Sequence, residues 1–200
     1  MVGYVNESKK FKDEVMESIV KSALATLVFL GSSWVFASDD DAVTVGGVEM
    51  ANSSKSAAFE AVKKKLGKWE GQMTQSLTGQ SFDVSYEWAL TSGGNTITES
   101  IIEDGVEMLT TYSDQDGKLV VRHYCGLGTE PVFKVSELEG NSMSIAVDAE
   151  RSGLHRGRHS FVTGMKWTMD PENPNNMIFE NTVVLDGQVT NNRAELSRAM

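Results

Sequence analysis

Hydrophobic and polar positions alternate with a period of two along most of the chain after position 68. Residues 82–90 are typical, because Phe82, Val84, Tyr86, Trp88 and Leu90 share one face while charged and small residues occupy the other. The same alternation predicts strands at 69–75, 82–90, 96–103, 106–113, 119–125, 131–138, 142–147, 161–169, 176–185 and 188–198. Turn signals such as Asp116-Gly117 and Asp186-Gly187 separate nearly all of them. Many short, evenly spaced strands predict an all-β antiparallel fold, either an up-and-down barrel or a sandwich, and a barrel leaves no exposed edges.

A helical period precedes the strands. Ala58, Phe59, Val62 and Leu66 recur at helical spacing. Ser53, Ser54 or Ser56 supplies the N-cap, and Gly67 is expected to end the helix. Lys63, Lys64 and Lys65 are expected to face water, stabilised by the C-terminal end of the helix dipole. We expect no second helix, and a short helix that closes one end of the barrel.

The first 37 residues have the pattern of a signal peptide. Lysines precede an apolar run from Ser22, which ends in Val35-Phe36-Ala37 before an acidic stretch. Met16 would begin a signal of more ordinary length. We therefore expect residues 1–37 to be cleaved, residues 38–52 to form a flexible lead-in, and residues 53–200 to form one domain. The predicted location is the periplasm or the exterior. An uncleaved anchor is the alternative, although the apolar run is short for a membrane span.

The net charge of the chain and its single cysteine limit the partners and the covalent cross-links that we expect for this protein. Residues 1–37 contain four basic and four acidic residues, so their removal leaves the net charge of −10 unchanged. Such an acidic domain is a poor match for nucleic acid or an anionic membrane surface, and we expect no stable membrane insertion after cleavage. The single cysteine, Cys125, cannot form an internal disulfide.

Two sets of residues carry a resemblance to known families. Gly67-Lys68-Trp69 lies between the predicted helix and the first strand and resembles the Gly-x-Trp signature of lipocalins and other calycins. This resemblance implies a calycin-like barrel of about eight to ten strands. It also implies that an Arg of the last strand, Arg198 or Arg193, covers Trp69.

The order of motifs through residues 93–131 is similar to a largely uncharacterised family of small exported bacterial barrels with a Thr-His-Tyr-Cys segment. Here Arg122 stands before His123-Tyr124-Cys125. The resemblance implies a fold and export but no activity. Some barrels of similar size, the nitrobindin type, bind haem through one His.

Three ionisable residues occupy positions where the alternation predicts an apolar face. Glu99 shares a face with Ile97 and Ile101, while His123 and Cys125 follow Val121 on the inward side of their strand. A structural explanation is a buried network in which Glu99 accepts a hydrogen bond from His123 or Tyr112.

The functional explanation that we favour is a lumen that binds a small, largely apolar or amphipathic molecule. Glu99 and His123 would supply its polar contacts. The full set of expected ligand-binding residues is Glu99, His123, Cys125, Tyr112, Met108, Tyr86 and Trp88. Haem binding through His123 is one alternative, and otherwise we expect no cofactor and no metal. Catalysis through Glu99, His123 and Cys125 is a less favoured alternative, and we assign no catalytic residue.

One basic cluster, residues 155–159 (HRGRH), falls between predicted strands. Its glycines predict a solvated loop, although it could form a cationic rim for an anionic ligand. The sequence contains no Cys-x-x-Cys and no Gly-x-Ser-x-Gly motif, which disfavours a zinc ribbon and α/β-hydrolase chemistry.

Overall fold

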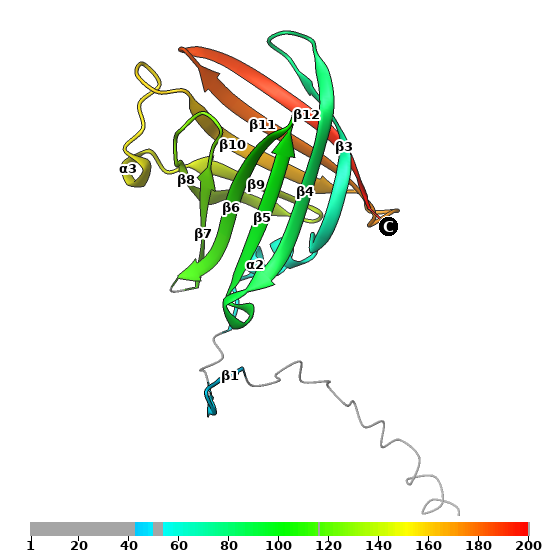
Figure 1. Ribbon diagram of the computed structural model, residues 1–200, viewed down its shortest axis with the longest axis vertical. Helices are drawn as coiled ribbons and strands as arrows, with labels where there is room; N and C mark the ends of the chain where they lie inside the picture. The colour runs from blue at the N-terminus through cyan, green and yellow to red at the C-terminus, as the bar shows by residue number, and fades with distance from the viewer. Residues whose placement is uncertain (1–42, 50–53, 116, 200) are drawn as a thin grey trace, which may run out of the picture. The chain divides into compact units, whose positions relative to one another are not determined.

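The computed structural model describes residues 43–49, 54–115 and 117–199. Ten antiparallel strands form a closed barrel in the order β10-β11-β12-β3-β4-β5-β6-β7-β8-β9 (Figure 1). The strands are β3 (Gly67–Gln75), β4 (Ser81–Thr91), β5 (Thr96–Glu103), β6 (Val106–Gln115), β7 (Lys118–Tyr124), β8 (Val132–Glu139), β9 (Ser142–Val147), β10 (Phe161–Met169), β11 (Asn176–Leu185) and β12 (Gln188–Arg198). The predicted all-β antiparallel barrel is therefore confirmed.

The segments before the barrel differ in part from the expectation. The expected signal peptide, residues 1–37, lies outside the described residues, as does most of the expected lead-in. Within the lead-in, β1 (Thr44–Val45) pairs with β2 (Val48–Glu49) through a turn at Gly46 and Gly47, both with positive φ. The alternation did not predict this hairpin, because each of its strands is only two residues long.

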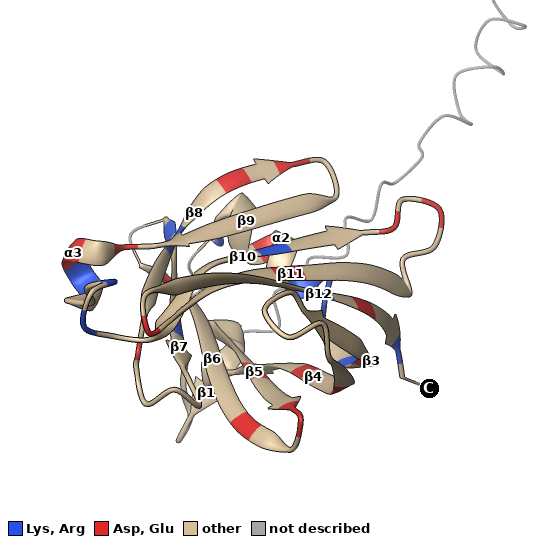
Figure 2. Cartoon of the chain, turned by 90° about the horizontal axis from the view of Figure 1, so that it is seen from above, with Lys and Arg blue, Asp and Glu red and all other residues tan. Residues whose placement is uncertain are grey.

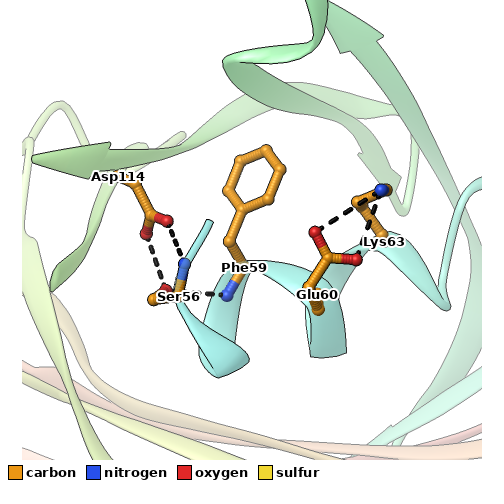
Figure 3. Close-up of polar contacts among 5 residues, drawn as sticks. All are labelled: Ser56, Phe59, Glu60, Lys63 and Asp114. Atoms are coloured by element: carbon orange, nitrogen blue, oxygen red, sulfur yellow. Dashed lines mark hydrogen bonds and ion pairs between the residues drawn. The ribbon is translucent and has the colours of Figure 1, made fainter. Parts of the chain in front are cut away.

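Helix α2 (Ala57–Lys63) lies at one end of the barrel (Figure 1). Ser56 is its N-cap, and the Ser56 hydroxyl accepts a hydrogen bond of 3.1 Å from the Phe59 amide (Figure 3). The Ser56 amide and hydroxyl both donate to the Asp114 carboxylate, at 2.5 and 2.7 Å. The cap thus fixes the start of the helix and ties it to the end of β6. Phe59 and Val62 are fully buried beneath the helix.

Two predictions about helices were wrong. Helix α2 ends at Lys63 rather than at Gly67, because the amides of Lys65 and Leu66 turn to the carbonyls three residues back and tighten the chain. A second helix, α3 (Ala149–Ser152), follows β9, capped by the Asp148 side chain and ended by Gly153. A 3₁₀ turn, η1 (Ser92–Gly94), joins β4 to β5. Turns this short leave no helical period in the sequence.

The strands alternate between the interior and the solvent as the period of two predicts. In β5, Ile97, Glu99 and Ile101 are buried, and in β7, Val121 and His123 are buried. Leu90, at the end of β4, is the exception to its predicted face, with 44% of its surface exposed. Within the described part of the chain, no helix combines the length and apolar character that crossing a membrane requires.

Candidate functional site

A cavity of about 320 Å³ lies in the barrel at the end opposite α2. Its walls reach the turn between β5 and β6 (Glu103, Asp104, Val106) and the loop after β7 (Gly126, Leu127). Helix α2, by contrast, is held at the other end of β6 through Asp114. The apolar part of the wall consists of Phe82, Ile101, Val106, Met108, Leu127, Val162, Met165, Phe179, Val183 and Leu185. A mostly apolar cavity with a few polar groups is the usual form of a small-molecule site.

The structure divides the seven expected ligand-binding residues between two levels of the barrel. Glu99, His123, Cys125 and Met108 line the cavity. Tyr86, Trp88 and Tyr112 are fully buried, and the described cavity wall does not include them. Direct contact of those three with a ligand stays a prediction.

These three aromatic residues belong to a packed layer beneath the cavity. Tyr86 stacks on Trp88 at 5.7 Å between ring centroids and meets the edge of Phe179 at 5.2 Å. Trp167 stacks on Phe179 at 5.5 Å and contacts Tyr112 at 6.2 Å. Phe179 also lines the cavity, so this aromatic layer forms its floor.

Glu99 is buried at the boundary between the cavity and the aromatic floor. The Tyr112 hydroxyl donates to Glu99 Oε2 at 2.5 Å, which agrees with one of the two partners expected from the sequence. Burial raises the pKa of Glu99 to about 7, while the Lys65 charge and hydrogen bonding by Tyr112 and Thr110 oppose this rise. Glu99 can therefore hold or release a proton near neutral pH.

Lys65 corrects an expectation from the sequence. It was expected to face water, but it is 2% exposed and reaches into the closed end of the barrel. Its Nζ lies 3.6 Å from the centroid of the Trp167 ring, 5.2 Å from Trp88 and 5.3 Å from Tyr112. No described residue accepts a hydrogen bond from this amine. An aromatic cage thus takes the place of solvent around Lys65.

Burial also governs the charge of Lys65. It lowers the pKa of Lys65 to about 7, although the Glu99 carboxylate favours the protonated amine. The helix ends two residues before Lys65, so the helical spacing that predicted an exposed lysine no longer applies at this position.

His123 is part of a hydrogen-bonded relay across β6 and β7. Its Nδ1 lies 2.9 Å from Thr110 Oγ1, and Thr110 also acts on Glu99 as a hydrogen-bond donor. No hydrogen bond joins a described residue to Nε2 of His123, and this nitrogen belongs to a residue of the cavity wall. Burial lowers the pKa of His123 to about 4, so the ring is neutral at pH 7.

Cys125 follows β7 and is half-buried on the cavity wall. Burial raises the pKa of its thiol, which disfavours the thiolate that a nucleophile requires. This chemistry gives no support to the less favoured catalytic alternative. Among the described residues, no group of three His, Cys, Asp or Glu side chains could hold a metal ion.

Several polar cavity residues were not recognised in the sequence. Asn192 Nδ2 donates to Asn181 Oδ1 at 2.8 Å, and Thr190 donates to Asn192 at 3.1 Å. Glu103, at the end of β5, accepts a hydrogen bond of 2.7 Å from the Tyr86 hydroxyl, and burial raises its pKa. Asn181 shares an inward face with Phe179 and Val183, so the signal that revealed Glu99 would have found it too.

The closed end contains the Gly67–Trp69–Arg198 arrangement expected from the sequence. The Arg198 guanidinium lies over the Trp69 ring at 4.4 Å and donates to the carbonyls of Leu66 and Lys64. Trp69 Nε1 donates to the Lys65 carbonyl at 2.8 Å. Gly67, with φ of 105°, leaves room for Arg198, since a Cβ there would lie 3.0 Å from its Nη1. Arg193 instead pairs on the outside with Glu180 and Glu195.

A solved structure resembles this barrel. It is a protein of unknown function from the DUF3598 family of Nostoc punctiforme PCC 73102, with a TM-score of 0.52 and 10% identity. The match covers 69% of this chain and 49% of that chain, so this chain spans about half the length of that protein. At this identity the likeness concerns the fold alone.

Two designed proteins match with lower scores. A redesigned β-barrel has 18% identity and a TM-score of 0.35, over 74% of this chain and 100% of its own. A de novo fluorescence-activating β-barrel has 13% identity and a TM-score of 0.33, over 70% and 97%. No protein-family model matches the sequence, and no curated protein matches it.

The two ends of the molecule differ in charge. A second hollow of about 290 Å³ lies beside α2, and its charged lining residues are three basic ones, Lys64, Lys65 and Arg198, and one acidic one, Asp170. The cavity at the opposite end has Glu99, Glu103 and Asp104 in its wall. The chain continues from α3 into a loop (Figure 2). As expected, residues 155–159 of this loop are largely exposed, and the His155 amide donates to His159 Nδ1 at 3.0 Å.

Proposed function

We propose that this protein is an exported, calycin-type barrel that binds a small, largely apolar molecule in the cavity opposite α2. The observation that carries the proposal is the cavity itself, about 320 Å³ with an apolar wall and a buried relay of His123, Thr110 and Glu99. Barrels of this size can hold one small ligand when side chains do not fill the interior. The signal-like N-terminal sequence supports export, and the packing of Arg198 on Trp69 supports the calycin assignment.

Native mass spectrometry tests binding directly. The protein, purified without added ligand, should have a defined extra mass that denaturation releases. A cavity-filling variant, Val183→Phe, should lose this mass while keeping its circular dichroism spectrum. Val183 lines the cavity, whereas Val189 on the neighbouring strand is 53% exposed. Val189→Phe is therefore the matched control and should keep the ligand. Equal occupancy of both variants would contradict the proposal.

Haem is a second candidate, favoured by one observation. His123 lines the cavity as a neutral imidazole, with Nδ1 at 2.9 Å from Thr110 Oγ1 and Nε2 not bonded to any described residue. This is the protonation state that a metal ligand requires. The three acids of the wall oppose the propionates of haem. An absorbance titration with hemin separates the candidates, because haem binding would give a Soret band that His123→Ala abolishes.

A further inference from the structure

The charged groups in the described cavity wall share one property, which is that all of them are acidic. Glu103 and Asp104 lie near the opening and Glu99 lies deeper. The described wall includes no Lys or Arg. Asn192 donates to Asn181 and accepts from Thr190, so these three neutral side chains form one hydrogen-bonded cluster. The wall therefore offers no positive charge to an anionic head group.

His123 lines the same cavity. Its Nδ1 lies 2.9 Å from Thr110 Oγ1, and no hydrogen bond joins a described residue to Nε2. Because the ring is neutral at pH 7, it contributes no positive charge that would attract a carboxylate. A ligand head group beside these residues thus meets a neutral imidazole and acidic side chains, and it meets no positive charge.

The two glutamates of the cavity wall, buried Glu99 and half-buried Glu103, have few partners among the described residues. Glu103 accepts from Tyr86, and no described lysine or arginine pairs with it. Glu99 accepts from Tyr112 and is acted on by the Lys65 charge from the closed end, yet Lys65 is outside the cavity wall. Carboxylates removed from water gain strongly from a cation that pairs with them.

We propose that the ligand of this cavity is an apolar amine, whose protonated nitrogen pairs with Glu103 or Glu99 while its hydrocarbon part lies against Phe82, Met165 and Phe179. This inference rests on the proposed function of the same cavity. It also opposes the cationic-rim hypothesis, because Arg156 and Arg158 are exposed on their loop and are outside the described wall of the cavity.

A matched ligand series tests the charge of the head group. Decylamine, decanol and decanoic acid have the same hydrocarbon chain with cationic, neutral and anionic heads, and calorimetry at pH 7.5 measures their affinities for the full-length protein. We expect decylamine to bind about tenfold or more tightly than decanol, since hydrogen bonds to charged groups contribute about 1.5–3 kcal/mol. Decanoic acid should bind weakest.

A pair of variants locates the effect. Glu103→Gln should reduce the preference for decylamine over decanol about tenfold. Glu107→Gln makes the same change of charge on the exposed face of β6 and should preserve the preference. If Glu103→Gln unfolds the barrel, the wild-type ratio of decylamine to decanol affinity still decides.

The outcomes separate the two proposals. Equal affinities for all three molecules, or tighter binding of decanoic acid, would overturn the amine assignment while the binding barrel stands. Failure of all three to bind would overturn both the amine assignment and the proposed function.

Discussion

Lys65 takes part in two kinds of interaction inside this barrel, cation–π contacts with aromatic rings and an electrostatic interaction with a carboxylate. Its amine is enclosed by Trp167, Trp88 and Tyr112, and its charge acts on Glu99 across the aromatic floor. Both pKa values shift toward neutrality, because burial disfavours each charged form. Both Lys65 and Glu99 therefore change protonation near pH 7, so the charge at the aromatic floor depends on pH.

Lys65 should make stability depend on pH above neutrality. Its pKa is about 7 in the folded protein, below the ordinary value of 10.5, so the unfolded chain binds more protons in between. The free energy of unfolding should then rise from pH 7.5 to 9.5, by at most about 1.4 kcal/mol per pH unit from this group. Lys65→Met should remove the rise in urea unfolding curves.

The neighbouring Lys64 provides the control, because it is exposed on the same turn. Lys64→Met should keep the wild-type slope of stability against pH. A Lys65→Met slope equal to that of the wild type would contradict the prediction.

Residue-level predictions from the sequence succeeded where a polar residue broke a regular strand pattern. Glu99 and His123 were placed inside because their neighbours at two-residue spacing are apolar, and both are buried. Lys65 follows the end of its helix, where no period governs direction, so nothing local indicated its burial. Tyr86 and Trp88 were assigned to the right face, but depth along the barrel depends on the register of neighbouring strands.

At the scale of elements, the pairing of β3 with β12 depends on a close approach of two backbones. Gly71 of β3 lies opposite Leu196 of β12. A Cβ at Gly71 would lie 2.0 Å from the Glu195 carbonyl oxygen and 3.1 Å from a Leu196 methyl group. A backbone carbonyl within a ladder cannot move aside without disturbing the pairing.

Gly71→Ala should therefore destabilise the barrel by about 3 kcal/mol, the upper range for overpacking, because β3 and β12 must separate. Thermal unfolding followed by circular dichroism measures this loss. Gly157→Ala is the matched control, since its Cβ would meet no atom within 4 Å. The control should change stability by less than about 0.5 kcal/mol. Equal melting temperatures for the two variants would contradict the expected clash.

The strands themselves could be predicted closely. The bounds of β5, β9, β10, β11 and β12 agree with the sequence prediction, because the end of the alternation coincides there with turn signals rich in Gly, Asp, Asn or Pro. The α3 turn could not be predicted, since a four-residue helix depends on the Asp148 cap and the Gly153 αL conformation rather than on a hydrophobic period.

At the scale of the whole molecule, the number of paired positions between neighbouring strands differs around the barrel. β7 pairs with β8 over three positions, Val120–Arg122, whereas β11 pairs with β12 over ten. β7 also contains His123 and leads to Cys125 on the cavity wall. The shortest strand pairing of the barrel, between β7 and β8, therefore lies beside the proposed site.

Hydrogen exchange should reveal this difference. Amides of β8 that face β7 should exchange at least about tenfold faster than those between β11 and β12, because local opening requires fewer broken bonds. Peptide-resolved mass spectrometry measures both, with the β3–β12 join as an internal reference. Uniform protection around the barrel would contradict the expectation.

The pairing of β3 with β12 also determines when the barrel can close during synthesis of the chain. Trp69 pairs with Arg198, 129 positions later in the chain. Contacts between residues far apart in the sequence form slowly, because closing the long loop costs chain entropy before the contact contributes any stabilisation. When β3 through β11 have left the ribosome, the sheet that they form has two unpaired edges, β3 and β11. Both edges stay unpaired until β12 is synthesised and pairs with them. The interval before closure is thus when the nascent chain is most exposed to aggregation, and chaperone protection is most useful then.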